Sequence, residues 1–267
     1  MLSYTIKNDC SIKYMTGYSY QKAFSKLRPE STYDTETRRK KANKMLAVLD
    51  DFYAGDLQKL TALDIGCSTG IITNILKDRF NRVVGIDIDE DAIKYARETH
   101  RRDNLQFCIQ DSMNLGFPEN SFDVVICAHV YEHVPDYMRL MREIHRVLNP
   151  GGVCYFAAGN RLSLMETHYK LPLLSVVPKF IGHMYLRLLG KGDYYYENHL
   201  TLRGLHNIAS IFKLIDYTGK IIADPAKYRA DEMLKAGSFK QRIAAFICKR
   251  AYMFCPTYIW LLVKERK

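Results

Sequence analysis

A glycine-rich turn is the first segment of this sequence whose residue types suggest chemistry. Asp64 belongs to a short apolar run, residues 62–65, and helical spacing begins at residue 71. The turn between them contains Gly66, Cys67, Ser68 and Gly70. Glycine lets the backbone approach a ligand without a Cβ clash, and the start of the following helix offers free amides. Because Ser68 replaces the middle glycine of the dinucleotide fingerprint GxGxxG, a tight connection without a ligand is the alternative.

Two further carboxylates follow the next two apolar runs. Asp87 ends the run at residues 82–86 and is followed by Ile88, so it is placed to accept hydrogen bonds from ribose hydroxyls. Asp111 and Ser112 follow the run at residues 105–109, where a carboxylate can meet an adenine amino group. A surface carboxylate that caps the next turn is the alternative for Asp111.

These residues require a parallel sheet to bring them together. Residues 61–158 alternate between strand-like and helix-like patterns, which predicts βαβ units. The expected strands are residues 62–65, 82–86, 105–109, 122–128 and 153–158, with helices at 71–80, 90–100 and 135–148. The carboxyl ends of such strands line one crevice, so the turn and the carboxylates should face a common ligand.

The regions on either side of this core have other patterns. We expect an N-terminal helical cap at residues 1–60, the core at 61–160, an insertion or lid at 161–200 and completion of the sheet at 201–267. Helices are predicted at residues 33–53 and 201–212, strands at 213–222 and 257–263, and a basic amphipathic helical region at 227–254. The fold class is therefore α/β: a doubly wound, mostly parallel, seven-stranded, Rossmann-like sheet.

Together these motifs resemble the class I S-adenosylmethionine (SAM)-dependent methyltransferases, and most of all their small-molecule type 11 group. The resemblance rests on residues 64–70, 85–88, 111–112, 120–125 and 148–152. It implies SAM as the cofactor. It also implies that Asp64 and residues 66–70 hold the methionine part, that Asp87 and Ile88 hold the ribose and one adenine face, and that Asp111 and Ser112 meet the adenine edge.

Histidines after the fourth and fifth strands are the candidate catalytic groups. In the family, the loop at residues 127–134 faces the cofactor, which implies that His129 contributes to the cofactor pocket and that His133 is a candidate general base. A neutral imidazole accepts a proton readily near pH 7. A structural, helix-capping role for His133 stays open, and so does a substrate contact for His168 in the insertion against a solvent-facing one.

No His, Cys and carboxylate trio has the local spacing of a metal site, so we expect no metal. His199 is interpreted as a loop or helix-start residue. The seven cysteines are interpreted as reduced residues, because they are odd in number and show no CxxC spacing.

The positive charge is confined to the C-terminal part. The net charge is +10, yet residues 1–160 hold 21 basic and 21 acidic residues, so the excess belongs to residues 161–267. Basic and aromatic residues interleave between residues 227 and 254, which suits an anionic membrane surface. A helix packed on the sheet with a solvated basic face is the plainer interpretation, and nucleic acid is the less favoured partner.

The resulting hypothesis is an enzyme that methylates a small or lipid-linked metabolite, with a hydroxyl oxygen as the expected target. A saccharide or its lipid-linked precursor is one candidate acceptor. The alternatives are a tRNA or rRNA methyltransferase and a catalytically inactive SAM-binding subunit. Neither a secretory signal nor a run of about 18 apolar residues is found. We therefore expect a cytoplasmic protein that could contact the membrane peripherally.

Overall fold

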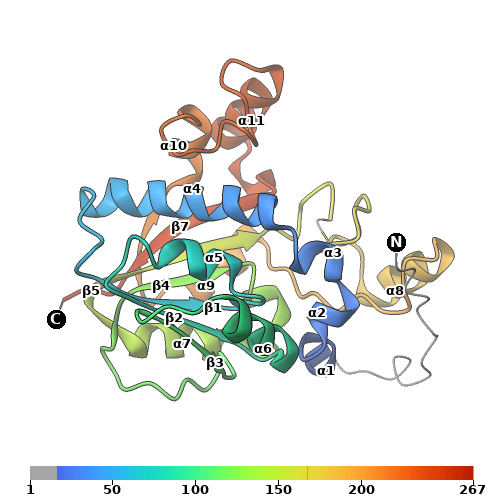
Figure 1. Ribbon diagram of the computed structural model, residues 1–267. Coiled ribbons are helices and arrows are strands. Elements are labelled where there is room, and N and C mark those ends of the chain that lie inside the picture. Colours follow the sequence, from blue (N-terminus) through green and yellow to red (C-terminus); the bar gives the residue numbers. More distant parts are fainter. Residues whose placement is uncertain (1–16, 167, 267) are drawn as a thin grey trace.

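The sheet has the predicted number of strands and is mostly parallel. A computed structural model describes residues 17–166 and 168–266 of the chain (Figure 1). Its strands are β1 (Thr61–Ile65), β2 (Arg82–Asp87), β3 (Leu105–Ile109), β4 (Phe122–Ala128), β5 (Leu148–Gly159), β6 (Lys213–Asp216) and β7 (Thr257–Val263). Their order is β3-β2-β1-β4-β5-β7-β6, and only β7 pairs antiparallel with its neighbours. This confirms the Rossmann-like α/β fold.

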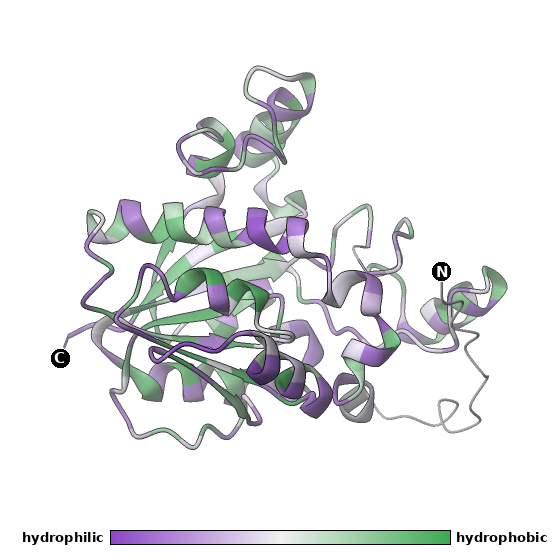
Figure 2. Cartoon of the chain, viewed as in Figure 1, coloured by the Kyte–Doolittle hydropathy of each residue, from purple (hydrophilic) through white to green (hydrophobic). Residues whose placement is uncertain are grey.

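Helices cover both faces of the sheet. They are α1 (Gly17–Gln21), α2 (Phe24–Leu27), α3 (Pro29–Thr32), α4 (Thr35–Tyr53), α5 (Ile71–Leu76), α6 (Glu90–Thr99), α7 (Tyr137–Val147), α8 (Lys179–Leu188), α9 (Leu202–Ile208), α10 (Thr218–Ala223) and α11 (Phe239–Arg250). Apolar side chains of α7 and α9 form the core on one face, and those of α4, α5 and α10 form the core on the other. The central strands are covered on both sides, which is why most of their residues are apolar (Figure 2).

Helix α4 positions one wall of the site described below. Asp34 caps its start by accepting a hydrogen bond from the Thr37 amide at 3.0 Å, and Ala54 ends it with a positive φ of 51°. Its buried apolar residues lie in the C-terminal two-thirds, from Ala42 to Leu49. The N-terminal part therefore extends past the packed core to the edge of the sheet where the strands end (Figure 1).

Two C-terminal predictions are wrong. The expected strand at residues 213–222 ends at Asp216, because the Asp216 carboxylate accepts the Thr218 amide at 2.8 Å and starts α10. The helical region expected at 227–254 is reduced to α11 and the 3-10 helix η3 (Tyr252–Phe254). Gly237 has a positive φ of 74°, which interrupts helical geometry, and Ser238 then caps the start of α11. No residue of α11 is fully buried, but Ile247 and Cys248 pack against the core on one face of the sheet, so the helix contacts the core only through part of its length.

The segment between β5 and α9 folds over the edge of the sheet where the parallel strands end. Isolated bridges join Asn160 to Leu200 and Met165 to Pro172. A small separate core contains Tyr169, Leu171, Leu174, Leu186 and Tyr195. This segment, with α8, carries His168 and His199 to the site.

Candidate active site

One cavity of about 1050 Å³ lies at the carboxyl ends of β1, β2, β3 and β4, under the N-terminal part of α4. Nine of the ten predicted cofactor-binding residues line it: Asp64, Gly66, Cys67, Ser68, Asp87, Ile88, Asp111, Ser112 and His129. The two predicted catalytic residues, His133 and His168, line it as well. The cavity is larger than the usual site for one drug-sized ligand, so it has room for a cofactor and an acceptor.

The glycine-rich turn brings the backbone to the cavity wall. Gly66 has a φ of 73°, and a Cβ on it would lie 2.7 Å from a methyl group of Val130. The amides of Gly66 and Cys67 both donate to the Ile86 carbonyl, at 2.9 and 3.0 Å, which ties the turn to β2. Gly70 is the predicted residue that does not line the cavity. Its own absent Cβ leaves space for the Phe107 ring, so its role is in packing.

Two carboxylates flank this turn, the buried Asp64 and the partly buried Asp87. Asp64 accepts a hydrogen bond from the Thr73 hydroxyl at 2.6 Å, and burial raises the pKa of Asp64 to about 7. Asp87 accepts from the amides of Ser68 and Asp89, at 2.8 and 3.0 Å. Burial also raises the pKa of Asp87. Each oxygen of Asp87 keeps a lone pair for a further donor.

The remaining predicted cofactor residues lie on loops after β3 and β4. The Asp111 carboxylate accepts the Met113 amide at 2.8 Å, which holds the loop around Ser112 in a tight turn. His129 has a φ of 58°, and its amide donates to the Ala157 carbonyl at 2.8 Å. Its Nδ1 lies 3.4 Å from the buried Glu132 carboxylate.

His133 is held as a neutral ring. Its Nδ1 lies 3.1 Å from Nε2 of Gln21. An amide nitrogen can only donate, so Nδ1 accepts and the ring proton is on Nε2. Burial lowers the pKa of His133 to about 3, despite the nearby carboxylate of Glu132.

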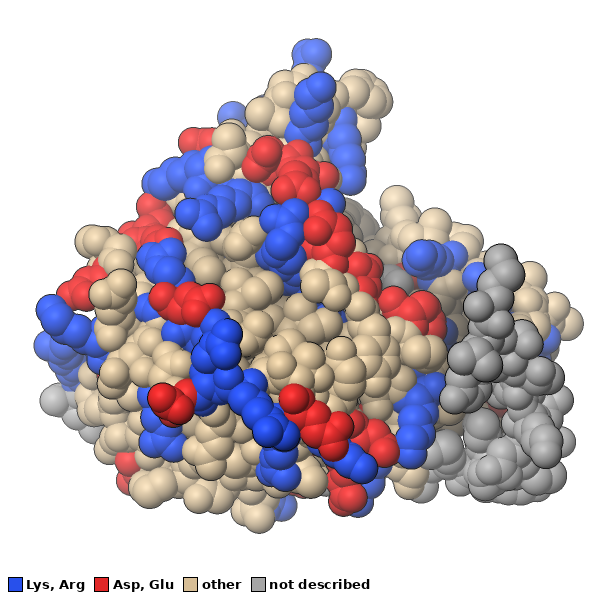
Figure 3. Space-filling model, in the orientation of Figure 1, with Lys and Arg blue, Asp and Glu red and all other residues tan. Residues whose placement is uncertain are grey.

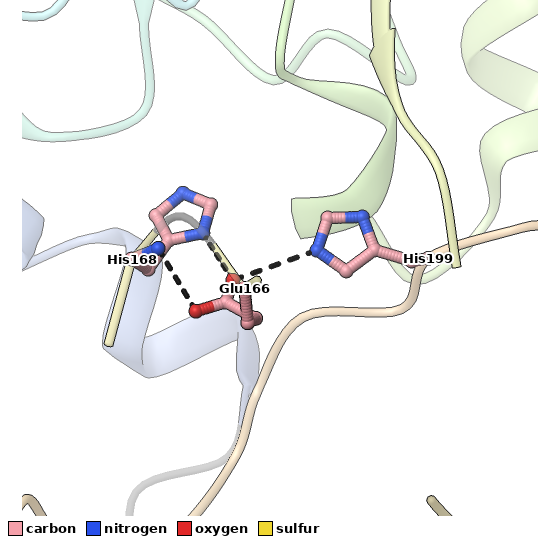
Figure 4. Close-up of side chains that lie close together, drawn as sticks. All are labelled: Glu166, His168 and His199. Carbon is pink, nitrogen blue, oxygen red and sulfur yellow. Dashed lines mark hydrogen bonds and ion pairs between the residues drawn. The ribbon is translucent and has the colours of Figure 1, made fainter. Parts of the chain in front are cut away.

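His168 carries its ring proton on the other nitrogen, Nδ1. Its Nδ1 lies 2.8 Å from Oε1 of Glu166 (Figure 4), and an ionised carboxylate only accepts, so Nδ1 carries the proton and Nε2 is left with the lone pair. The amides of His168 and Tyr169 donate to the other Glu166 oxygen at 2.9 and 2.7 Å and fix the carboxylate. Burial alone would lower the pKa of His168, but Glu166 and the neighbouring charges of Glu197 and Glu132 raise it.

His199 completes a cluster that the sequence did not reveal. Its Nε2 lies 3.7 Å from Oε1 of Glu166, and the three ligand atoms of Glu166, His168 and His199 lie within 4.8 Å of one another (Figure 4). Two imidazoles and a carboxylate are common ligands of divalent metal ions such as zinc. Sequence spacing therefore missed this trio, because the fold joins Glu166 and His199, which are 33 positions apart. The Glu166 oxygens are already hydrogen-bonded within the chain.

The sequence also gave no reason to assign the cations of this cavity. Arg28, Arg38, Lys41, Lys44, Lys170 and Lys191 line it. Residues 38–41 form a visible basic run in the sequence, but only the position of α4 above the strand ends directs Arg38 and Lys41 inward.

Comparison with known proteins identifies the family. Residues 63–156 match the family described as "Methyltransferase domain". Over 188 residues the chain is 31% identical to demethylmenaquinone methyltransferase of Staphylococcus epidermidis, which covers 65% of this chain and 78% of that protein.

The chain belongs to the class I SAM-dependent methyltransferases. The enzyme of the same name from Lactococcus lactis is 32% identical over 143 residues, or 51% of this chain and 56% of that protein. Solved structures agree in fold. A SAM-dependent methyltransferase of Thermotoga maritima has a TM-score of 0.54 at 15% identity, with 93% of this chain and 100% of that chain covered. A complex of the Trm112 methyltransferase activator and a methyltransferase from Haloferax volcanii has a TM-score of 0.54 at 17% identity. The match covers 94% of this chain and 97% of that chain.

The cavity of this methyltransferase fits its cofactor. The backbone of the Gly66 turn lies at the cavity wall, and the cavity is also lined by the buried carboxylate of Asp64 and the partly buried carboxylate of Asp87. SAM carries an ammonium group and ribose hydroxyls, which are the donors such carboxylates need. When bound, SAM supplies an electrophilic methyl group on a sulfonium.

Proposed function

We propose that this methyltransferase acts on a small or lipid-linked acceptor from which His168 removes a hydroxyl proton. The observation that carries the proposal is the hydrogen bond between His168 and Glu166 at the wall of the cofactor cavity. A base that is oriented by a buried carboxylate and keeps one free nitrogen is a recurring arrangement for proton removal.

The two predicted catalytic histidines are unequal in this role. His168 has its lone pair on Nε2 and a raised pKa, which favours proton acceptance. His133 has a pKa near 3 and its Nδ1 is used by Gln21, so it is a weak base. The rings lie 5.0 Å apart, edge to face, so His133 is suited to orient the acceptor beside His168.

The names of the relatives support an acceptor of this type. Several similar proteins are named for demethylmenaquinone as the acceptor. Removal of a hydroxyl proton prepares an oxygen for methylation, and it also activates a ring carbon next to a phenolic oxygen. A saccharide or its lipid-linked precursor carries hydroxyls too, so these remain acceptors to be screened together with quinols.

The acceptor test is a screen for SAM-dependent product formation. The purified protein is incubated with SAM and with quinols, saccharides and their lipid-linked forms, and the methylated product is detected by mass spectrometry. His168→Gln should reduce turnover of the acceptor by about 10²–10⁴-fold. Affinity for S-adenosylhomocysteine should stay within a few-fold. Turnover near that of the wild type in His168→Gln would overturn the assignment of the base.

We also propose that Asp87 holds the ribose of the cofactor. Its partly buried carboxylate is held by the amides of Ser68 and Asp89 and lines the cavity. Asp87→Ala should weaken SAM binding by about 10–100-fold, since charge-assisted hydrogen bonds contribute about 1.5–3 kcal/mol. Isothermal titration calorimetry measures this, and an unchanged affinity would contradict the role.

We further propose that α11 and η3 contact an anionic membrane surface. Phe239 is 77% exposed and Phe246 66% exposed on α11, and Phe254 of η3 is 51% exposed. Lys240, Arg242, Lys249 and Arg250 lie on the same helix. Lys and Arg side chains are visible on the projection formed by α10 and α11 (Figure 3). Exposed phenylalanines beside basic residues suit the interface of an anionic bilayer.

A further inference from the structure

Two lysines of α4, Lys41 and Lys44, line the cavity without forming an ion pair to any carboxylate of the described residues. We propose that Lys41 and Lys44 form an anion subsite that binds a phosphate or diphosphate group of the acceptor. This rests on the proposed function, because it names the chemical class of the acceptor. Both residues line the cofactor cavity and, being three positions apart, lie on the same side of the helix.

Two neighbouring basic residues of the helix, Arg39 and Lys40, form ion pairs, which distinguishes them from Lys41 and Lys44. The ammonium nitrogen of Lys40 lies 3.3 Å from a carboxylate oxygen of Glu36 and 3.0 Å from one of Glu232. A guanidinium nitrogen of Arg39 lies 2.8 Å from a carboxylate oxygen of Glu36. Among residues 17–166 and 168–266, no carboxylate lies within 4.0 Å of the ammonium of Lys41 or Lys44. Burial and then the charge of Lys41 lower the pKa of Lys44 to about 8. An anion bound between the two lysines would offset the unfavourable burial and mutual repulsion of their charges.

The cofactor does not supply the missing negative charge. SAM has one carboxylate but also an ammonium and a sulfonium, so its binding adds positive charge to the cavity. Arg38 interacts electrostatically with the predicted cofactor residues Asp64 and Asp87, and it is available for that single carboxylate. Lys41 and Lys44 therefore remain for a second ligand.

The surroundings of the lysines favour a phosphate that carries an organic group. The same cavity is lined by Tyr155 and Ala157 of β5 and by Ile259 of β7, and Ala157 and Ile259 are paired neighbours in the sheet. This floor is apolar, while the lysines above it provide the charge. A soluble phosphorylated compound and the phosphate head of a lipid carrier share this chemistry.

Calorimetry with inorganic pyrophosphate tests the subsite in the full-length protein. We expect the double variant Lys41→Gln, Lys44→Gln to bind pyrophosphate at least about 10-fold more weakly than the wild type, since two charge-assisted contacts are lost. Lys40→Gln is the matched control, because Lys40 is a neighbour on the same helix with acidic partners. It should bind pyrophosphate as the wild type does.

Titration with S-adenosylhomocysteine separates the two hypotheses. If the wild type binds S-adenosylhomocysteine but not pyrophosphate, or if the double variant binds pyrophosphate unchanged, the subsite is wrong and the methyltransferase function stands. If acceptor turnover is absent while pyrophosphate affinity still depends on the lysines, the function assigned to the acceptor site fails and the anion site stands.

A measurement on the wild type covers the case in which the double variant does not fold. Pyrophosphate should protect Lys41 and Lys44, but not Lys40, from acetylation followed by mass spectrometry. Equal labelling of all three with and without pyrophosphate would overturn the proposal.

A second labelling experiment uses phosphatidylcholine vesicles with and without phosphatidic acid in place of pyrophosphate. Protection by these vesicles assigns the phosphate to a lipid, and protection by pyrophosphate alone assigns it to a soluble compound.

Discussion

Asp64 is a titratable group whose ionisation should be coupled to cofactor binding. Burial raises its pKa to about 7, so much of it is protonated and neutral below that pH. A cationic cofactor group favours the ionised form, so SAM affinity should rise with pH between about 6 and 8 and binding should release a proton. Calorimetry in buffers of different ionisation enthalpy measures both effects. Asp64→Asn should abolish the pH dependence, and a flat profile in the wild type would contradict the prediction.

Glu166 should act on the reaction through His168. Its carboxylate holds Nδ1 of His168, and the pKa of His168 is raised above 6.5. The group accepts a proton only in its neutral form, so turnover should rise as the pH increases through that raised pKa. Glu166→Gln removes the negative charge and should move the pKa of His168, and the acidic limb of the pH profile, to lower pH.

Nuclear magnetic resonance of the histidine ring protons measures this pKa without an acceptor. His206→Asn is a control, because His206 is exposed and stacks on Trp260 away from the cluster. An unchanged pKa of His168 in Glu166→Gln would show that the carboxylate does not tune the base.

At the scale of elements, the turn between β1 and α5 depends on Gly70. Its φ is 75°, and a Cβ on it would lie 2.6 Å from the Phe107 ring on β3. Gly70→Ala should therefore destabilise the protein by about 1–2 kcal/mol for the left-handed backbone and by about 1–3 kcal/mol more for the overpacked ring.

Gly55→Ala separates these two costs. Gly55 also has a positive φ, of 85°, but nothing lies within 4 Å of the position a Cβ would take. It should show the backbone cost alone. Chemical denaturation measures the unfolding free energy of both variants. Equal losses would mean that the contact with Phe107 adds no cost at Gly70.

At the scale of the whole molecule, the net charge of +10 belongs to residues 161–267, which include the exposed helix α11. Helix α11 projects with α10 beyond α4 (Figure 1) and keeps both apolar and basic side chains exposed. Within the described part of the chain, every helix falls short of the length or apolarity needed to cross a bilayer. The proposed contact of α11 and η3 with an anionic membrane rests on these exposed side chains.

Sedimentation with liposomes tests this contact. The protein should bind vesicles that contain anionic lipid at low salt and lose binding at moderate salt, because surface charges are screened. Phe239→Ser with Phe246→Ser should weaken binding several-fold while the unfolding temperature changes little, since both side chains are exposed. Binding that is equal for neutral and anionic vesicles, or unaffected by the double substitution, would contradict the interpretation.

The amino-acid sequence by itself determined the strands of the parallel core and the positions of the candidate cofactor residues at their ends. Each strand is a local apolar run, and Asp64, Asp87 and Asp111 follow or end such runs, so neighbouring residues suffice to place them at the strand ends. The tertiary structure alone decided the cluster of Glu166, His168 and His199, and the inward direction of Lys41 and Lys44. The histidine cluster joins residues from separate parts of the insertion, and the lysines depend on where α4 crosses the sheet. Such contacts follow from packing between distant segments, which no local pattern of residues encodes.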